Sequence, residues 1–212
     1  IQVDIGSGMD DPLAQTFVVQ RGGLPGGASA GFLSSIDLYF KSKDPRTGVT
    51  VEIRECENGT PTAKVLPFSR MHLDSDRIHI GDQNTVTNVA FASPVAVTAG
   101  KEYAIVILPD GNSPEYAVYT AKAGQTALGN AGKVVNNDWG SGTLFLSTNN
   151  RTWTEFLDED MKFGVKCCVF TSSRANVILE NDDYEFFTAN NFTVTGSFVE
   201  NAEVFKQTAN AS

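Results

Sequence analysis

The sequence is poor in the residues from which most metal sites and disulfide frameworks are built. It has three cysteines and two histidines in 212 residues. A small and odd number of cysteines gives no disulfide framework, so we expect reduced thiols. Cys167 and Cys168 are neighbours in an alternating segment, which predicts one core thiol and one outer thiol. With only His72 and His79 as nitrogen ligands, we expect no zinc site, no other metal and no cofactor.

Long apolar runs and excess positive charge are also lacking. The longest aliphatic stretch is Ala104 to Leu108, far shorter than the roughly 20 residues of a membrane helix. The formal net charge of -9 disfavours nucleic acid and anionic membrane surfaces. We therefore expect no nucleic-acid partner and no membrane insertion. The chain opens on Ile1 without a signal-type sequence, so we expect a mature or excised segment of a longer protein.

Motifs of enzymes are lacking as well. The pattern Gly-x-Ser-x-Gly occurs from Gly27 to Gly31, but no helix follows it, so it predicts no nucleophile elbow. Both histidines alternate with apolar neighbours. The glycine-rich stretch from Gly22 to Gly31 has no lysine and no helix after it, so it predicts a loop rather than a phosphate cradle. The carboxylate clusters Asp74 to Asp76, Asp158 to Asp160 and Asp182-Asp183 lack the spacing of a calcium loop and are better interpreted as solvated turns. We expect no enzymatic activity.

What the sequence has is period-two alternation, the pattern of half-buried strands. From Phe32 to Lys41, one face carries Phe32, Ser34, Ile36, Leu38 and Phe40, and the other carries Ser35, Asp37, Tyr39 and Lys41. From Val49 to Glu55, Val49, Val51 and Ile53 alternate with Thr50, Glu52 and Arg54. Both segments predict an antiparallel sheet with one dry face and one wet face.

About ten such segments follow one another between turn residues, which predicts an all-β, antiparallel, jelly-roll-like sandwich. Glu102 to Leu108 is apolar on both faces and predicts a central strand, whereas Leu13 to Gln20 is taken as a strand with an open edge available for assembly. The composition changes near residue 172. We therefore expect a lead-in at 1–10, the sandwich at 11–171, and a linker with a short β extension at 172–212.

Several blocks also carry a family resemblance. They are Asp11 to Phe17, Ser35 to Asp44, Val49 to Glu55 with Asn58-Gly59, Phe91 to Val95, and Gly100 to Leu108, followed by Asn150 to Thr154 and Asp160 to Phe163. In this order they resemble the β-sandwich modules of baseplate and tail-fibre proteins of T4-like contractile-tailed phages, including cyanophages. The resemblance implies a jelly-roll-like fold similar to carbohydrate-binding modules, with no cofactor and no catalysis.

Two functions are consistent with this resemblance. The first is a virion structural module, assembled in the host cytoplasm, whose partners are other virion proteins or copies of itself. The alternative is a glycan- or receptor-binding module on the virion surface. Rings stack on sugar faces, so the candidate ligand-binding residues for this alternative are Trp139, Tyr116, Tyr119 and Trp153. Aromatic residues of a sandwich more often belong to its core.

Overall fold

The computed structural model of the chain describes residues 2–5, 12–126, 134 and 142–171. The chain divides into two compact units, Ile1–Val169 and Phe170–Ser212. Residues 172–212, for which the sequence predicts a linker and a further β element, lie outside the described residues. The fold below is that of the first unit.

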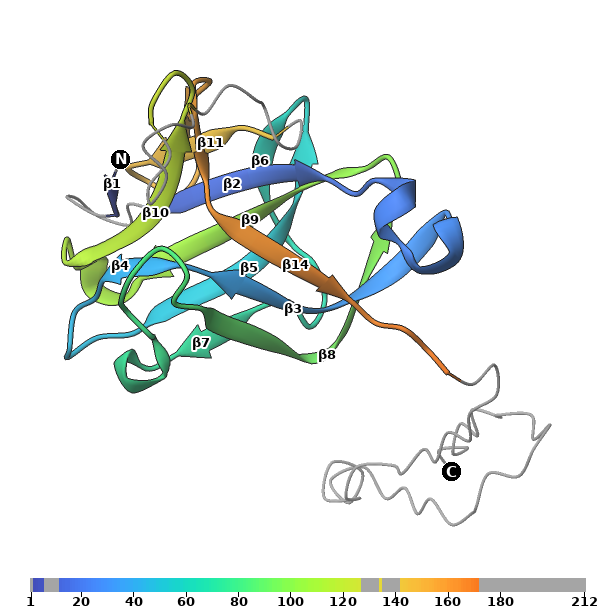
Figure 1. The fold of residues 1–212 in the computed structure, drawn as a ribbon, viewed down its shortest axis with the longest axis horizontal. Helices are drawn as coiled ribbons and strands as arrows, with labels where there is room; N and C mark the ends of the chain where they lie inside the picture. The colour runs from blue at the N-terminus through green and yellow to red at the C-terminus, as the bar shows by residue number, and fades with distance from the viewer. Residues whose placement is uncertain (1, 6–11, 127–133, 135–141, 172–212) are drawn as a thin grey trace, which may run out of the picture. The chain divides into compact units, whose positions relative to one another are not determined.

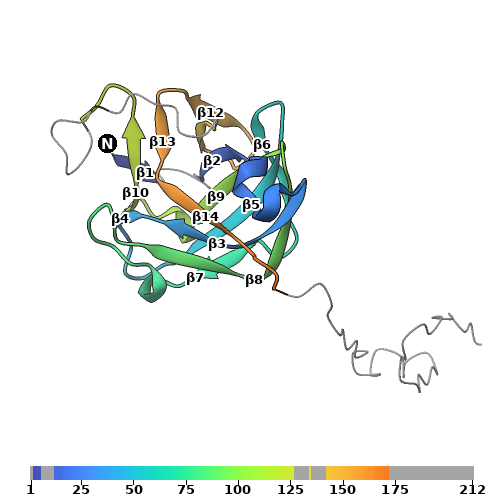
Figure 2. The ribbon, with the colours of Figure 1, turned by 45° about the vertical axis from the view of Figure 1, so that its right-hand side comes forward.

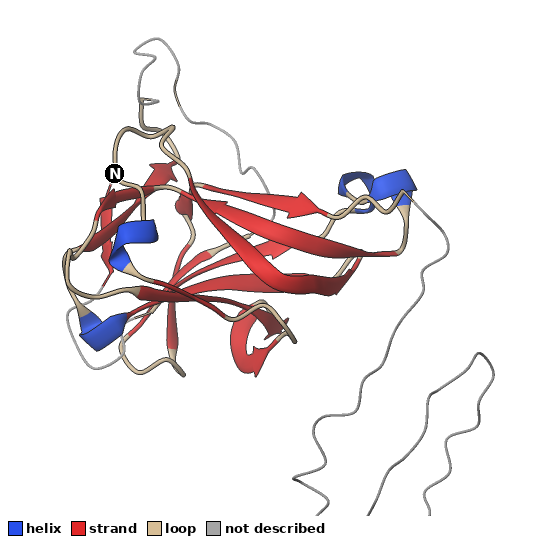
Figure 3. Cartoon of the chain, turned by 90° about the horizontal axis from the view of Figure 1, so that it is seen from below, coloured by secondary structure: helices blue, strands red, loops and turns tan. Residues whose placement is uncertain are grey.

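The described residues form strands joined by turns and four short 3-10 helices, as Figure 3 shows. In chain order the strands are β1 (Gln2–Ile5), β2 (Leu13–Val18), β3 (Ala30–Leu38), β4 (Phe40–Ser42), β5 (Val49–Glu57), β6 (Thr60–Val65), β7 (Met71–Leu73), β8 (Thr87–Thr98), β9 (Glu102–Pro109), β10 (Tyr116–Lys122), β11 (Leu144–Ser147), β12 (Trp153–Phe156), β13 (Glu159–Met161) and β14 (Phe163–Cys167). The 3-10 helices are η1 (Arg21–Gly23), η2 (Pro25–Gly27), η3 (Ser75–Arg77) and η4 (Asp110–Asn112). No described residue belongs to a helix long and apolar enough to cross a membrane.

The strands form antiparallel sheets, which confirms the predicted all-β class. The largest has the order β12-β11-β2-β9-β5-β6, with β7 also paired to β5. A three-stranded sheet has the order β14-β3-β8, and these three strands lie side by side in Figures 1 and 2. A third sheet has the order β1-β10-β13, with β4 also paired to β10. A sandwich built in this way buries the faces that the sheets turn toward one another.

The main core is built from the alternating apolar faces of these sheets. Val49, Val51 and Ile53 of β5 are fully buried there, as the sequence pattern predicts. The predicted central strand is confirmed, since β9 pairs with β2 on one side and with β5 on the other. Both of its faces are buried: Ile105 belongs to the main core and Val106 to a second apolar cluster.

A bulge in β3 changes which of its residues face the core. Against β14, Ser35 pairs with Lys166 and Leu33 pairs with Cys167, so Ser34 is an extra residue of β3 that reverses the alternation beyond it. The pairing of β3 with β8 is irregular at the same point. Ile36 and Phe40 are buried as expected, but Leu33 is 1% exposed and Phe32 is 41% exposed. The expectation that Phe32 lies on the same face as Ile36 and Phe40 is therefore wrong, and Leu33 occupies the core position.

The ends of several elements also differ from the sequence prediction. Residues 2–5, expected in a lead-in, form a strand that pairs with β10. Pro94 lies inside β8, where proline is tolerated because β8 is an edge strand and its pairing with β3 is irregular there. The alternating segment that contains Cys167 begins only at Phe163, as β14, and the preceding β13 belongs to a different sheet.

The turn between β4 and β5 is held in place by Asp44, which is 3% exposed. Its carboxylate accepts hydrogen bonds from the backbone N–H of Arg46 and the hydroxyl of Ser113, both at 2.8 Å. These bonds lower the pKa of Asp44 from its ordinary 3.8 to about 2. Tyr116 donates its hydroxyl to the backbone oxygens of Asp44 and Thr47, which fixes the same turn to β10.

The pKa of Asp44 predicts part of the acid sensitivity of the fold. Because the folded pKa is below the unfolded value, the carboxylate stabilises the protein above about pH 4, and this stabilisation is lost as the pH falls towards 2. The melting temperature of Asp44→Asn should consequently fall less steeply than that of the wild type over this interval, as followed by circular dichroism. Asp76→Asn, at an exposed position, is the control. Parallel pH profiles for Asp44→Asn and wild type would contradict this assignment.

Candidate functional site

The candidate aromatic residues do not share one surface. Trp139 lies outside the described residues. Tyr116 is 0% exposed and packs edge-on against Phe40, so it is a core residue and presents no ring face to a ligand. Tyr119 is half-buried on the same strand and donates its hydroxyl to the backbone oxygen of Gly81. Trp153 is half-buried in a different sheet.

The environment of Trp153 shows that the largest sheet curls on itself. Arg54 of β5 lies over the Trp153 ring, 6.0 Å from its centre, although β9, β2 and β11 separate β5 from β12 in the sheet order. Phe145 packs edge-on against Trp153, and the small residues Ala14 and Ala104 line the same concave face. This face is therefore filled by the side chains of the sheet itself.

An ion-pair cluster lies on this concave face. Glu52 is 0% exposed and Arg54 is 3% exposed, so the predicted wet face of β5 is buried at these positions. One carboxylate oxygen of Glu52 contacts the guanidinium of Arg54 at 2.5 Å, and the other accepts from Nε of Arg70 at 2.6 Å. The curl of the sheet explains the difference from the prediction. With each of its oxygens bound by an arginine, Glu52 ties β5 to the segment that contains Arg70.

Other titratable groups are engaged in separate local contacts. In the Asp158 to Asp160 cluster, Asp158 pairs with Lys122, Glu159 accepts from the hydroxyl of Thr120, and Asp160 accepts from Gln15. His72 lies 2.7 Å from the carboxylate of Asp110. Within the described ranges, no three His, Cys, Asp or Glu side chains converge in a way that could hold a metal ion. The Asp182-Asp183 pair lies outside these ranges.

The described thiols are free and half-buried. Burial, with a smaller contribution from Glu102, raises the pKa of Cys56 to about 12. Cys167 packs against the main core, and burial likewise raises its pKa. At neutral pH Cys56 is therefore a thiol rather than the thiolate that acts as a nucleophile.

The strand edges are arranged differently from the sequence expectation. The segment expected to offer an open edge, Leu13 to Gln20, contains β2, which is paired on both sides, with β9 and with β11. The edge is therefore closed from Leu13 to Gln15. In the described part of the chain, β8 pairs with β3 alone and forms the edge of the three-stranded sheet.

β8 has the properties of an edge that can receive another chain. It runs for 12 residues, and none of them is charged. The whole chain, by contrast, has 16 lysines and arginines and 25 aspartates and glutamates. Its exposed side chains are Asn88, Ala90, Ala92, Pro94, Ala96 and Thr98. Charged residues on edge strands normally prevent pairing with other chains, and in β8 only the bulge and Pro94 serve that purpose. The lack of charge was visible in the sequence, but the position of β8 at an edge was not.

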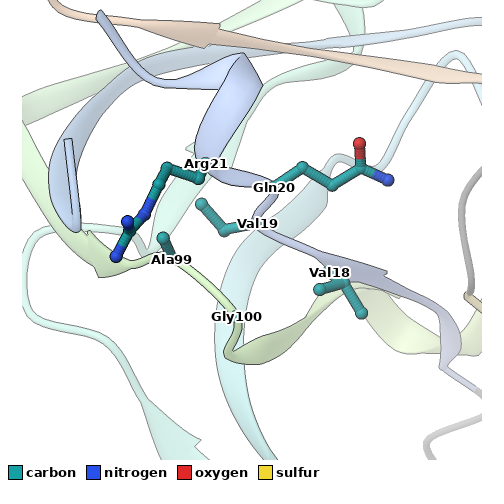
Figure 4. Close-up of a pocket in the computed structure, with 6 residues that line it drawn as sticks. All are labelled: Val18, Val19, Gln20, Arg21, Ala99 and Gly100. Carbon is teal, nitrogen blue, oxygen red and sulfur yellow. The ribbon is translucent and has the colours of Figure 1, made fainter. Parts of the chain in front are cut away.

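A shallow hollow of about 420 Å³ lies between the end of β2 and the turn before β9. It is lined by Val18, Val19, Gln20, Arg21, Ala99 and Gly100. Figure 4 shows Val19, Ala99 and Arg21 grouped on one side of it and Gln20 directed away from them. The backbone is fixed here, since Gly100 N–H donates to Val19 O at 2.8 Å and Val19 N–H donates to Lys101 O at 3.0 Å. The sequence alone gave no sign of this hollow.

Comparison with known proteins finds no matching protein family, no similar curated protein and no similar solved structure.

Proposed function

We propose that this chain is a non-catalytic structural module of a phage virion, located in a tail baseplate or tail fibre, and that it acts by protein–protein assembly. The observation that carries the proposal is the 12-residue edge strand β8, which has no charged residue. An open antiparallel edge offers backbone donors and acceptors to a strand of a neighbouring protein. The sequence resemblance to tail modules supplies the setting, and the partners are other virion proteins or further copies of the chain.

Charge placed on β8 tests this proposal. We would introduce Ala90→Lys and Ala96→Lys into the encoding phage and follow the chain by immunogold electron microscopy of purified particles. Lysines on an edge strand oppose the addition of another strand. The wild-type chain should label the tail, and the variant should be missing from particles or leave tails incomplete. Particles that are never labelled would overturn the proposal.

A matched control separates assembly from folding. Ala121→Lys places the same charge at an exposed position of β10, where Ala121 pairs with Asp160 of β13. It should leave labelling and tail structure unchanged, while all purified variants retain the melting temperature of the wild type. The glycan-binding alternative is tested by applying the purified chain to a glycan array and to host surface polysaccharide. Saturable binding that is lost in Trp139→Ala or Trp153→Ala would favour the glycan- or receptor-binding function over the assembly function.

A further inference from the structure

The sequence of the edge strand β8 is nearly the same in both directions. Residues 89–97 read Val-Ala-Phe-Ala-Ser-Pro-Val-Ala-Val, with Ser93 at the centre. Valines stand four positions before and after Ser93, alanines stand three positions before and after it, and the polar Asn88 and Thr98 stand five positions away. Phe91 has the apolar Val95 as its counterpart. The side chains of β8 therefore have an approximate twofold symmetry about Ser93.

The exposure of these side chains has the same symmetry. Val89, Val95 and Val97 are buried, whereas every even-numbered residue of β8 is exposed. This alternation continues through Ser93, although residues 91–94 lie opposite the single residue Ser34 of β3. A second β8, turned by 180° about an axis perpendicular to the sheet and beside Ser93, would thus place buried residues opposite buried residues and exposed residues opposite exposed ones.

The backbone groups of β8 are oriented for such a pair. Ala99 N–H donates to Ser29 O at 2.9 Å, so the backbone at residue 99 is directed toward β3. Because the N–H and C=O groups of successive residues in a strand point to alternate sides, those of the even-numbered residues of β8 point to the open edge. The twofold arrangement sets these even-numbered residues against one another. Pro94 removes only one donor from each copy, next to the axis.

We propose that β8 pairs antiparallel with β8 of a second copy of this chain, with Ser93 beside the twofold axis. The sheet β14-β3-β8 then continues into the same sheet of the second copy. Val89 faces Val97 of the second copy and Phe91 faces Val95, and such pairs of β-branched and aromatic residues stabilise antiparallel strands. This inference rests on the proposed assembly function and narrows its partner to a second copy.

Symmetry and charge favour a second copy over a different protein. In a twofold interface each residue pair occurs twice, so the surface must be complementary to itself, which the symmetric order of β8 provides. A strand of another protein would require no such symmetry. The chain has a net charge of -9, and like charges placed opposite one another in a sheet oppose pairing. The uncharged β8 brings no such charges together. Because the interface uses the same edge of both copies, association stops at a dimer.

Sedimentation velocity and disulfide trapping of the purified 212-residue protein test the pairing and its register. The wild type should reach a dimer, and no larger species, as its concentration rises. Under mild oxidation Ser93→Cys should give a covalent dimer, because the Cα atoms of the two residues beside the axis would lie about 4.5 Å apart, within reach of a disulfide. Ala90→Cys should not, since its two thiols would be separated by six residues of strand, about 20 Å. The wild type shows the background from Cys56, Cys167 and Cys168.

Charge complementation tests the same register without a covalent bond. Ala90 faces Ala96 of the second copy, so Ala90→Lys combined with Ala96→Lys sets lysine against lysine, and the corresponding double glutamate variant sets glutamate against glutamate. Each variant alone should require at least about tenfold more protein to dimerise than the wild type. Mixed together, the two should form a one-to-one heterodimer, because lysine then faces glutamate. Association of the mixture also shows that both variants are folded.

Three results would contradict the self-pairing of β8. They are a wild type that stays monomeric, a Ser93→Cys protein that forms no more covalent dimer than Ala90→Cys, and a charged mixture that does not associate. The labelling of particles is measured separately. If the wild type is monomeric but the lysine variant is lost from particles, self-pairing is wrong, and the proposed assembly function stands with β8 receiving a strand of another virion protein.

Discussion

Replacing Glu52 by Gln should lower the free energy of unfolding by about 3–5 kcal/mol, the usual cost of breaking a buried ion pair. The carboxylate is 0% exposed and binds Arg54, which is 3% exposed and packs over Trp153. Without the negative charge, the guanidinium of Arg54 stays in the concave face of the curled sheet with no ionic partner. Urea denaturation followed by tryptophan fluorescence and circular dichroism measures the change.

A double variant identifies the source of this loss. Glu52→Met combined with Arg54→Met removes both charges and keeps apolar volume in the concave face, so it should be far less destabilised than Glu52→Gln alone, and close to neutral. Arg70→Ala should cost less than Glu52→Gln, because Arg70 is 65% exposed and leaves Glu52 still bound by Arg54. If the double variant were as unstable as the single one, loss of packing rather than an unpaired charge would be responsible.

Replacing Leu33 by Ala should lower the free energy of unfolding by about 2–5 kcal/mol, the range for a large aliphatic side chain removed from a core. Leu33 is 1% exposed and belongs to the main core. Phe32→Ala, one position earlier, should cost clearly less although it removes a larger side chain, because Phe32 is 41% exposed. The comparison of neighbours tests the bulge between Leu33 and Ser35 directly.

Chemical denaturation under identical conditions measures the free energies of unfolding of Leu33→Ala and Phe32→Ala. A larger loss for Phe32→Ala than for Leu33→Ala would mean that the alternation continues unbroken from Phe40 back to Phe32, and that the bulge is placed wrongly. Phe40→Ala serves as a reference, since its ring is fully buried against Tyr116 and its loss should fall in the range of about 3–5 kcal/mol.

The comparison of Phe32 with Leu33 also shows how far local pattern predicts this fold. Alternation correctly identified the core face of β5 and the doubly buried β9, because each depends on hydrophobicity along one strand. A bulge depends on the partner strand, so the period of β3 alone could not reveal it. The burial of Glu52 and Arg54 follows from the curl of a whole sheet, which no single segment encodes.

At the candidate sites too, some features can be read from the local sequence and others depend on the folded chain. The absence of charge in β8 can be read from the sequence, whereas its place at an edge depends on strand order. Strand order also explains why β2 is interior, since both of its neighbours come from much later in the chain.

This order has a consequence for synthesis on the ribosome. β2 begins at Leu13, but its partners β9 and β11 extend to Pro109 and Ser147. The nascent chain therefore carries an unpaired β2 until most of the first unit has been made. Pairings between segments so distant in sequence form slowly, because the long loop between them must close first. A chain that ends before Leu144 would keep one edge of β2 open permanently and would be prone to aggregate through the strand that the finished protein encloses.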